Sequence, residues 1–444
     1  MTVAWNNYWC ELAWLGGEQV EEGVLLEVVG DRIAGVTAGL PSPPAGSERL
    51  SGLTIPGLVN VHSHAFQRAL RGRTNAGEGS FWTWRERMYE LAATLDPDSY
   101  LALARATFGE MLLAGITLAG EFHYLHHGPG GAPYASPNEM GEALIQAAAE
   151  TGIRLTLIDA CYLSGGIGRR LEGAQLRFGD GDAERWAARV DTLQEGPQVM
   201  VAAALHSVRA VPPEQVPALV EWAARRGRPL HVHLSEQPAE NQACQEAYGK
   251  SPARLLADAG AVHGNLVAIH GTHLSDTDLA LLGGAGAGVC LCPTTERDLA
   301  DGIGRAGAMR EAGIPLTLGS DSNAVVDLFE EARGVELDER LLTGRRGLHA
   351  APELLGAATE AGARALCWPR AGKLDVASPA DLTVLSLAGV RMAGTRPDNA
   401  VEAAVFAAGA GDVREVMVGG RWVVRGGAHV SLDVPRLLAA AISR

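Results

Sequence analysis

The residues best suited to chemistry are two histidines, His62 and His64, which end an apolar, β-branched run that begins at Pro56. Such a run predicts a buried strand, and because side chains alternate along a strand, both imidazoles project from the same face. Neutral imidazoles placed in this way can occupy two corners of a divalent metal site. Taken alone, the motif fits a pair of polar residues at a strand end equally well.

Three further polar residues favour the metal interpretation. His233 lies in the segment HVHLSEQ (231–237), His270 in IHG (269–271) and Asp321 in GSDSN (319–323). Each of them lies at or near the end of an apolar run, as the two histidines of the first motif do. This recurrence predicts that the five side chains belong to one shared site.

The composition of the 444-residue chain is that of a globular protein and restricts its partners. Its hydrophobic content of 47% and charged content of 20% are ordinary. The net charge of −15 argues against a nucleic acid or an anionic membrane as partner. We expect neither a secretory signal nor a membrane span, because the first residues form no basic segment and no apolar run reaches about 18 residues. Six cysteines without a Cys-x-x-Cys motif fit a reducing cytoplasm.

Apolar runs recur through the middle of the chain and predict alternating strands and helices. Eight such runs lie at 55–61, 115–119, 153–159, 199–205, 229–234, 266–270, 287–292 and 314–319. Segments rich in Ala, Leu, Arg and Glu predict helices at 97–114, 139–151, 182–195, 213–226 and 275–283. Eight strand–helix units predict an α/β fold, the (β/α)8 TIM barrel, over residues 55–372. Catalytic residues of that fold follow the carboxyl ends of its strands, where this sequence has its histidines and acidic residues.

Both ends of the chain are rich in short predicted strands. The N-terminal candidates lie at 12–14, 23–29 and 32–36, and the C-terminal ones at 380–385, 401–407 and 413–424. The last segment predicts a hairpin that turns at Gly419 and Gly420. We therefore predict one small β-sandwich domain that is built from both termini, residues 1–54 and 373–444.

The combination of a barrel, a β-domain from both termini and the order His-x-His, His, His, Asp resembles the amidohydrolase superfamily over the whole chain. More narrowly, five segments resemble the formimidoylglutamate deiminase family: HSHAFQR (62–68), FWTWRE (81–86), EFHYLHH (121–127), HLSEQ (233–237) and CPTTE (292–296). This resemblance implies a cytoplasmic homodimer that hydrolyses N-formimino-L-glutamate, a dianionic substrate, to N-formyl-L-glutamate and ammonia in histidine degradation.

The resemblance also implies a metal site. Its ligands would be His62, His64, His233 and Asp321, a set that binds zinc and leaves room for a water molecule. Zinc lowers the pKa of such a water to about 7. Many members of the superfamily hold two metals bridged by a carbamylated lysine at a strand end. Since neither Lys250 nor Lys373 ends a predicted barrel strand, we expect one zinc ion per chain.

Three residues near that metal receive catalytic roles from the resemblance. Glu236 would be the proton shuttle that takes a proton from water or substrate and passes it to the leaving nitrogen. His270 would orient the attacking water or stabilise developing charge, and Asp321 would accept the proton of the water as well as bind zinc. The alternative for Glu236 is a solvated loop glutamate.

A substrate with two carboxylates requires cationic and hydrogen-bonding groups. By their position in the matching motifs, the candidates are Gln67, Arg85, Tyr124, His206 and Arg209. An arginine suits a carboxylate because its planar fork donates two parallel hydrogen bonds. For both arginines the alternative is an exposed residue in a surface salt bridge.

Two other functions fit parts of this pattern. A deaminase of an aminated purine, pyrimidine or triazine ring has the same zinc ligands and the same His-x-x-Glu motif. It binds a flat neutral ring, however, for which two arginines in the pocket are unfavourable. A non-catalytic scaffold would have lost metal ligands, whereas every ligand position is filled here.

Overall fold

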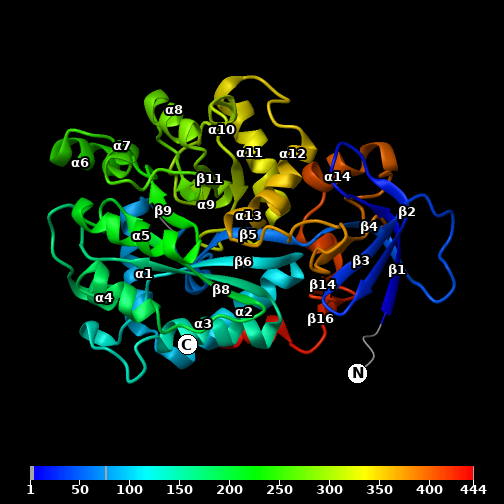
Figure 1. Cartoon of the computed structure of the whole chain (residues 1–444), viewed down its shortest axis with the longest axis horizontal. Helices are drawn as coiled ribbons and strands as arrows, with labels where there is room; N and C mark the ends of the chain where they lie inside the picture. Colours follow the sequence, from blue (N-terminus) through cyan, green and yellow to red (C-terminus); the bar gives the residue numbers. More distant parts are fainter. Residues whose placement is uncertain (1–4, 76–77, 444) are drawn as a thin grey trace.

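The computed structural model describes residues 5–75 and 78–443 and contains two eight-stranded sheets (Figure 1). The first is parallel and has its strands in chain order. They are β5 (Leu58–Ser63), β6 (Ile116–His123), β7 (Arg154–Cys161), β8 (Val199–Ser207), β9 (Leu230–Leu234), β10 (Leu266–His270), β11 (Gly288–Leu291) and β12 (Leu316–Leu318). Each of the eight apolar runs forms one of these strands, which confirms the predicted barrel.

The barrel closes between its first and last strands. Just past β12, the amide of Asp321 donates to the carbonyl of His62 at 2.9 Å. The amide of His64 donates in turn to the carbonyl of Asp321 at 2.9 Å. These bonds connect the carboxyl ends of β5 and β12, so the two outermost pieces of the predicted site become direct neighbours.

Helices cover the outside of the barrel (Figure 1). They include α2 (Pro97–Leu113), α3 (Glu139–Thr151), α4 (Ala183–Val190), α5 (Val216–Arg226), α6 (Pro238–Tyr248), α7 (Pro252–Asp258), α8 (Asp276–Ala285), α9 (Pro293–Asp298), α10 (Ala306–Glu311) and α11 (Leu328–Thr343). Helix α2 shows how local sequence sets these bounds. Asp96 caps it by accepting from the Ser99 amide at 2.8 Å, and Pro97 occupies its first position, where no amide hydrogen is needed.

The second sheet is mixed and combines strands from both termini, as predicted. Its order is β16-β15-β14-β13-β4-β1-β2-β3. The strands are β1 (Trp5–Ala13), β2 (Glu21–Val29), β3 (Arg32–Thr37), β4 (Glu48–Pro56), β13 (Leu382–Leu385), β14 (Val413–Val418), β15 (Arg421–Arg425) and β16 (Ala428–His429). Strand β4 pairs with β13 and leads directly into β5, so this sheet anchors the strand that carries the two histidines.

The hairpin prediction is confirmed, because β14 and β15 are joined through Gly419 and Gly420 at φ of 54° and 72°. The strand predicted over 401–407 is wrong: that segment forms helix α14 (Ala400–Phe406). Its buried residues are Ala400, Val401, Ala404 and Val405, which share one face at helical spacing. An apolar run of this length does not distinguish a strand from a buried helix by periodicity alone.

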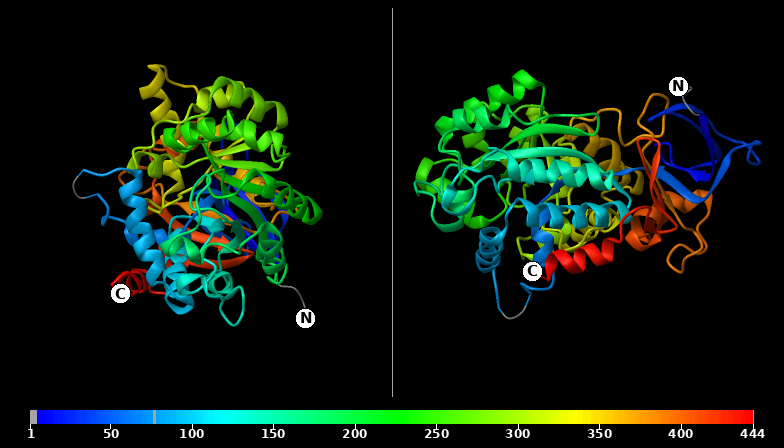
Figure 2. Two further views of the ribbon diagram at one scale, coloured as in Figure 1. Left: turned by 90° about the vertical axis from the view of Figure 1, so that its left-hand side faces the viewer. Right: turned by 90° about the horizontal axis from the view of Figure 1, so that it is seen from below.

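The small sheet and the barrel lie at opposite ends of the molecule (Figure 2). The C-terminal helix α15 (Val434–Ile442) returns to the barrel and packs against α2. In the described part of the chain, no helix combines the length and the apolar character that crossing a bilayer requires.

Candidate active site

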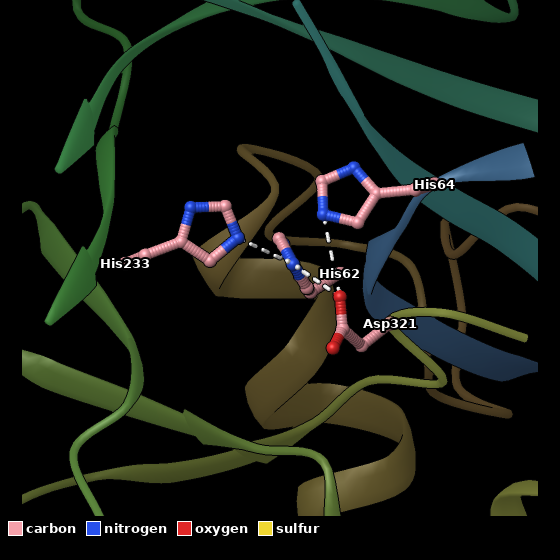
Figure 3. Close-up of side chains that lie close together, drawn as sticks. All are labelled: His62, His64, His233 and Asp321. Atoms are coloured by element: carbon pink, nitrogen blue, oxygen red, sulfur yellow. Dashed lines mark hydrogen bonds and ion pairs between the residues drawn. The ribbon is translucent and has the colours of Figure 1, made fainter. Parts of the chain in front are cut away.

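Four side chains converge at the carboxyl end of the barrel (Figure 3). They are His62 and His64 from β5, His233 from β9, and Asp321, which follows β12. All four are buried, and their ligand atoms lie within 4.8 Å of one another. The Nε2 atom of His62 is 3.1 Å from Asp321 Oδ1 and 3.1 Å from His233 Nε2. The sequence-predicted ligand set is thus brought together.

Backbone carbonyls fix the tautomers of two of these histidines. The Nδ1 atom of His64 donates to the carbonyl of Phe122 at 2.8 Å, and that of His233 to the carbonyl of His206 at 2.9 Å. Because a carbonyl only accepts, Nδ1 carries the proton and the Nε2 lone pair faces the cluster. Burial also lowers the pKa of His62 to about 4, which keeps this imidazole neutral. Neutral nitrogens and a carboxylate directed at one point fit a divalent metal such as zinc.

The loops that present these groups adopt strained conformations. Ser235, His270 and Asp321 have φ of 51°, 69° and 44°, in the left-handed region that side chains other than glycine rarely adopt. Each follows or ends a barrel strand on the carboxyl side of the barrel. Such strain costs about 1–3 kcal/mol per residue and clusters at functional sites, where surrounding contacts maintain it.

The two lysines of the chain take part in ion pairs elsewhere. Lys250 pairs with Asp258 at 2.7 Å and Lys373 with Glu360 at 2.8 Å. Neither lysine lies on a barrel strand, as the sequence predicted.

Glu236 and His270 lie next to the candidate ligands. Glu236 is buried, and its Oε1 atom is 3.6 Å from His270 Nε2. Burial raises the pKa of Glu236 above its ordinary value of 4.5. Burial alone would lower the pKa of His270, but the nearby carboxylates of Glu236, Glu296 and Asp321 outweigh it and raise this pKa well above 6.5. The alternative of a solvated glutamate at position 236 does not hold.

The cluster opens into a pocket that His64, His233 and Asp321 help to line. Its apolar lining consists of Phe81, Trp84, Met88, Tyr89, Tyr124, Tyr162, Phe178 and Leu299. All five residues predicted to bind substrate also line it: Gln67, Arg85, Tyr124, His206 and Arg209. Gln67 donates to the hydroxyl of Tyr124 at 2.9 Å, so these two polar groups already form a pair in the pocket wall.

Arg85 enters the pocket from helix α1 (Phe81–Thr94), which belongs to the long excursion between β5 and β6. Its guanidinium lies over the ring of Trp82, 4.5 Å from the centroid, and 5.5 Å from that of Tyr89. Among the described residues it has no acidic partner within ion-pair distance, and its Nε is buried without a hydrogen bond. Arg85 is therefore not a surface salt-bridge residue, and its charge remains available to a ligand.

Arg209 follows β8 and is largely buried, with 15% of its side chain exposed. Its Nε donates to Glu240 Oε2 at 2.6 Å, while its Nη2 is 3.7 Å from Glu236 Oε2. Burial would lower the pKa of this guanidinium, but Glu240 and Glu236 outweigh that effect and raise it, so Arg209 carries its charge. His206 lies near the end of β8. It is kept neutral because burial lowers its pKa well below 6.5.

A second buried group, His123, His126 and Asp159, lies outside this pocket. His126 donates from Nε2 to the carbonyl of Ala160 at 2.9 Å, which leaves its Nδ1 to accept from His123 at 3.3 Å. Asp159 accepts two hydrogen bonds from Arg189, at 2.8 and 2.9 Å. Since these groups satisfy one another, they need no metal.

Comparison with known proteins gives the family. The model of the amidohydrolase family matches residues 53–423, which is most of the chain. The chain belongs to the amidohydrolase family.

Relatives and solved structures resemble this amidohydrolase over most of its length. Formimidoylglutamate deiminase from Pseudomonas aeruginosa is 38% identical over 398 residues, 86% of this chain and 87% of the relative. An 8-oxoguanine deaminase from the same organism is 31% identical over 434 residues, 96% of this chain and 93% of the relative. An amidohydrolase structure from Brucella melitensis has a TM-score of 0.91 at 32% identity and covers 99% of both chains. A zinc-bound adenosine deaminase structure from Xanthomonas campestris, at 23% identity, has a TM-score of 0.84 over 98% of this chain and 97% of its own.

Two acidic residues of this amidohydrolase site had no role in the sequence prediction. Glu296 lies 3.4 Å from His270 Nδ1 and accepts from the Cys292 amide at 3.0 Å. Glu240 holds Arg209, as described above. The CPTTE motif contained a signal for Glu296, since this glutamate follows a strand end by a few residues. Glu240 occupies the first turn of a helix, where a solvated acid is the ordinary expectation.

Proposed function

We propose that this amidohydrolase hydrolyses N-formimino-L-glutamate to N-formyl-L-glutamate and ammonia, a step of histidine degradation. The observation that carries the proposal is that Arg85 and Arg209 line the same pocket as three of the four candidate metal ligands, His64, His233 and Asp321. Two cations around one pocket suit a substrate with two carboxylates. The 38% identity to a formimidoylglutamate deiminase supports the same substrate.

The proposed cofactor is one zinc ion per chain, held by His62, His64, His233 and Asp321. When bound, zinc lowers the pKa of a water ligand to about 7 and so supplies a nucleophile near neutral pH. The neutral imidazoles and the carboxylate described above fit this ion. The surrounding residues would transfer the protons and hold the substrate.

Glu236 would move the proton. In the proposed reaction, water adds to the formimino carbon, the bond from this carbon to the terminal nitrogen breaks, and ammonia leaves. The water oxygen ends as the formyl carbonyl oxygen and so loses both of its protons, and the imino nitrogen gains both as it leaves as ammonia. The raised pKa of Glu236 suits both transfers near neutral pH. His270, whose pKa is also raised, would donate a hydrogen bond from Nε2 to negative charge that develops beside Glu236.

The pocket wall would hold the substrate in place. One carboxylate would meet the outer edge of the Arg209 guanidinium and the other would meet Arg85. Gln67, Tyr124 and His206 would supply neutral hydrogen-bonding groups between them. The aromatic lining excludes water and so strengthens these charged contacts.

A second candidate is the deamination of an aminated ring. Its support is the 31% identity to an 8-oxoguanine deaminase and the aromatic lining of the pocket, on which a flat ring could stack. The two arginines favour the dianionic substrate over this candidate.

Ammonia release separates the two candidates. The purified protein should be assayed with N-formimino-L-glutamate, 8-oxoguanine, guanine, cytosine and adenosine at equal concentration. We expect kcat/KM to be highest for N-formimino-L-glutamate. Faster release from one of the rings, with little from N-formimino-L-glutamate, would replace the proposed function with the second candidate.

A further inference from the structure

Glu240 is a buried acid whose two oxygens are both engaged at the edge of the pocket. It lies in the first turn of α6, and its carboxylate is fully shielded from solvent. One oxygen, Oε1, accepts from the backbone amide of Ser235 at 3.0 Å. The other, Oε2, accepts from Arg209 Nε at 2.6 Å. One carboxylate thus links the strand-end turn after β9 to a pocket arginine.

The bond to Nε determines how Arg209 is presented. A guanidinium that is held through Nε keeps its outer edge, Nη1 and Nη2, for a second partner. The only other acid within ion-pair distance of Arg209 among the described residues is Glu236, at 3.7 Å. Without Glu240, the guanidinium would therefore turn toward Glu236 and form a close pair with it. Glu240 keeps the cation free for a ligand and separate from the proposed proton shuttle.

The bond to Ser235 stabilises the same region from the backbone side. Ser235 has a φ of 51°, a conformation that costs free energy for a residue with a side chain. The charge-assisted bond to Glu240 offsets this cost. Since Glu236 is the next residue, Glu240 positions both the shuttle and the arginine.

We propose that Glu240 is a positioning residue for carboxylate specificity: it holds Arg209 through Nε so that the outer edge of the guanidinium meets one carboxylate of the substrate. The identity of that substrate rests on the proposed function, whereas the orientation of Arg209 does not.

The first variant is Glu240→Gln, which has nearly the same shape. A glutamine has one acceptor oxygen and one donating amide group, so it can keep the bond from the Ser235 amide but can no longer also accept from Arg209 Nε. The matched control is Glu336→Gln. Glu336 is equally buried and accepts from Arg340 Nε at 2.8 Å and from the His349 amide at 2.9 Å, but it does not line the pocket.

Kinetics with three substrates give the specificity readout. For N-formimino-L-glutamate, Glu240→Gln should raise KM and lower kcat/KM by about ten- to a hundred-fold, with zinc content unchanged. The loss should disappear for one of the two singly amidated analogues, N-formimino-L-glutamine or N-formimino-L-isoglutamine, each of which keeps only one carboxylate. Glu336→Gln should leave all three kcat/KM values unchanged. An equal loss on all three substrates in Glu240→Gln would mean that Glu240 supports only the turn at Ser235, and would overturn the inference.

A double variant checks that the effect passes through Arg209. The combination Glu240→Gln/Arg209→Met should be no slower on N-formimino-L-glutamate than Arg209→Met alone, because the two residues act as one unit. Multiplicative losses would contradict this. The double variant removes both charges of the buried pair. Its comparison with Arg209→Met therefore still tests the inference if Glu240→Gln alone does not fold.

A crystal structure of Glu240→Gln separates this inference from the proposed function. If Glu240→Gln does not fold, the structure of Arg209→Met is determined instead. In Glu240→Gln we expect the Arg209 guanidinium to move toward Glu236, shortening the 3.7 Å separation. In Arg209→Met we expect the turn at Ser235 to remain, because Glu240 still accepts its amide. An unmoved Arg209, or a rearranged Ser235 turn, overturns the inference whatever the substrate is. Failure of the wild-type protein to release ammonia from N-formimino-L-glutamate would instead overturn only the proposed function.

Discussion

At the scale of single residues, the environment of Glu236 determines what this carboxyl group can do. It is buried next to His270 and Arg209, and burial raises its pKa. We expect Glu236→Gln to keep its fold and its zinc while kcat falls by roughly 10²–10⁴-fold, the usual contribution of a positioned general acid–base. Steady-state kinetics and metal analysis of the same samples measure this. Near wild-type kcat with full zinc would assign the proton transfer to Asp321 or His270 instead.

The two pocket arginines give a second prediction for single residues. Arg85→Met should lower kcat/KM for N-formimino-L-glutamate by about ten- to a hundred-fold, because a charge-assisted hydrogen bond is lost. The loss in kcat/KM should shrink for the analogue that lacks the carboxylate bound by Arg85. For Arg209→Met, the loss should shrink for the analogue that lacks the other carboxylate. Arg87→Met is the control, since Arg87 lies on the same helix in an exposed pair with Glu90. If both pocket variants lose activity equally on N-formimino-L-glutamate and on its singly amidated analogues, the arginines are structural.

The sequence contained enough to predict most residues of the candidate site. Polar residues that end apolar strands stand out, which is why His62, His233 and Asp321 could be grouped in advance. Glu240 could not be assigned in this way, because a glutamate in the first turn of a helix fits the helix dipole without any tertiary partner. Its burial and its pairing with Arg209 depend on how α6 packs against the turn after β8.

At the scale of elements, the long barrel strands were predictable and the short segments of the small domain were less so. Each parallel strand is buried on both faces and reads as a continuous apolar run, as in β5 and β7. The segment 401–407 is as apolar as these strands, yet it forms helix α14. Its four buried residues share one face of the helix. In a segment of only seven residues, however, this pattern of apolar residues is also compatible with a strand.

Arg189 joins helix α4 to strand β7 and gives a prediction on stability. It forms ion pairs with Asp159 and Asp180, both at 2.8 Å and both buried. Burial would raise the pKa of each carboxyl, but the guanidinium outweighs it at Asp159, and the hydrogen bond from His127 together with the guanidinium outweighs it at Asp180, so both pKa values lie below the ordinary 3.8. This stabilisation is therefore present above about pH 4 and is lost as the pH falls through the lowered pKa values.

Arg189→Met should destabilise the fold by about 3–5 kcal/mol at pH 7, because two buried carboxylates lose their partner. The unpaired carboxyls then have raised pKa values, so the deficit should become smaller as the pH is lowered from 7 to 5. Urea unfolding at the two pH values measures both effects. The control is Arg226→Met, which breaks a more exposed pair with Asp191 and should cost at most about 1 kcal/mol. A cost of that size in Arg189→Met as well would contradict the prediction.

At the scale of the whole molecule, the small sheet and the barrel share a continuous segment of chain. Strand β4 pairs with β1 and β13 and then continues into β5, so both termini hold the strand that carries His62 and His64. The sequence predicted that the two termini form one domain. It did not predict that β13 would be the neighbour of β4, because pairing between strands more than 300 residues apart depends on the folded barrel between them.

The candidate metal ligands connect three separate points around the barrel, β5, β9 and the segment after β12. Zinc should therefore stabilise the whole fold by mass action, by about 2.7 kcal/mol when free zinc is a hundred times its Kd. We expect about one zinc per chain, a lower Tm after treatment with a chelator, and recovery of Tm on addition of zinc. His62→Ala should bind no zinc tightly, lack activity and show no chelator-dependent shift in Tm. Two tightly bound metals per active chain, or an unchanged shift in His62→Ala, would contradict this ligand set.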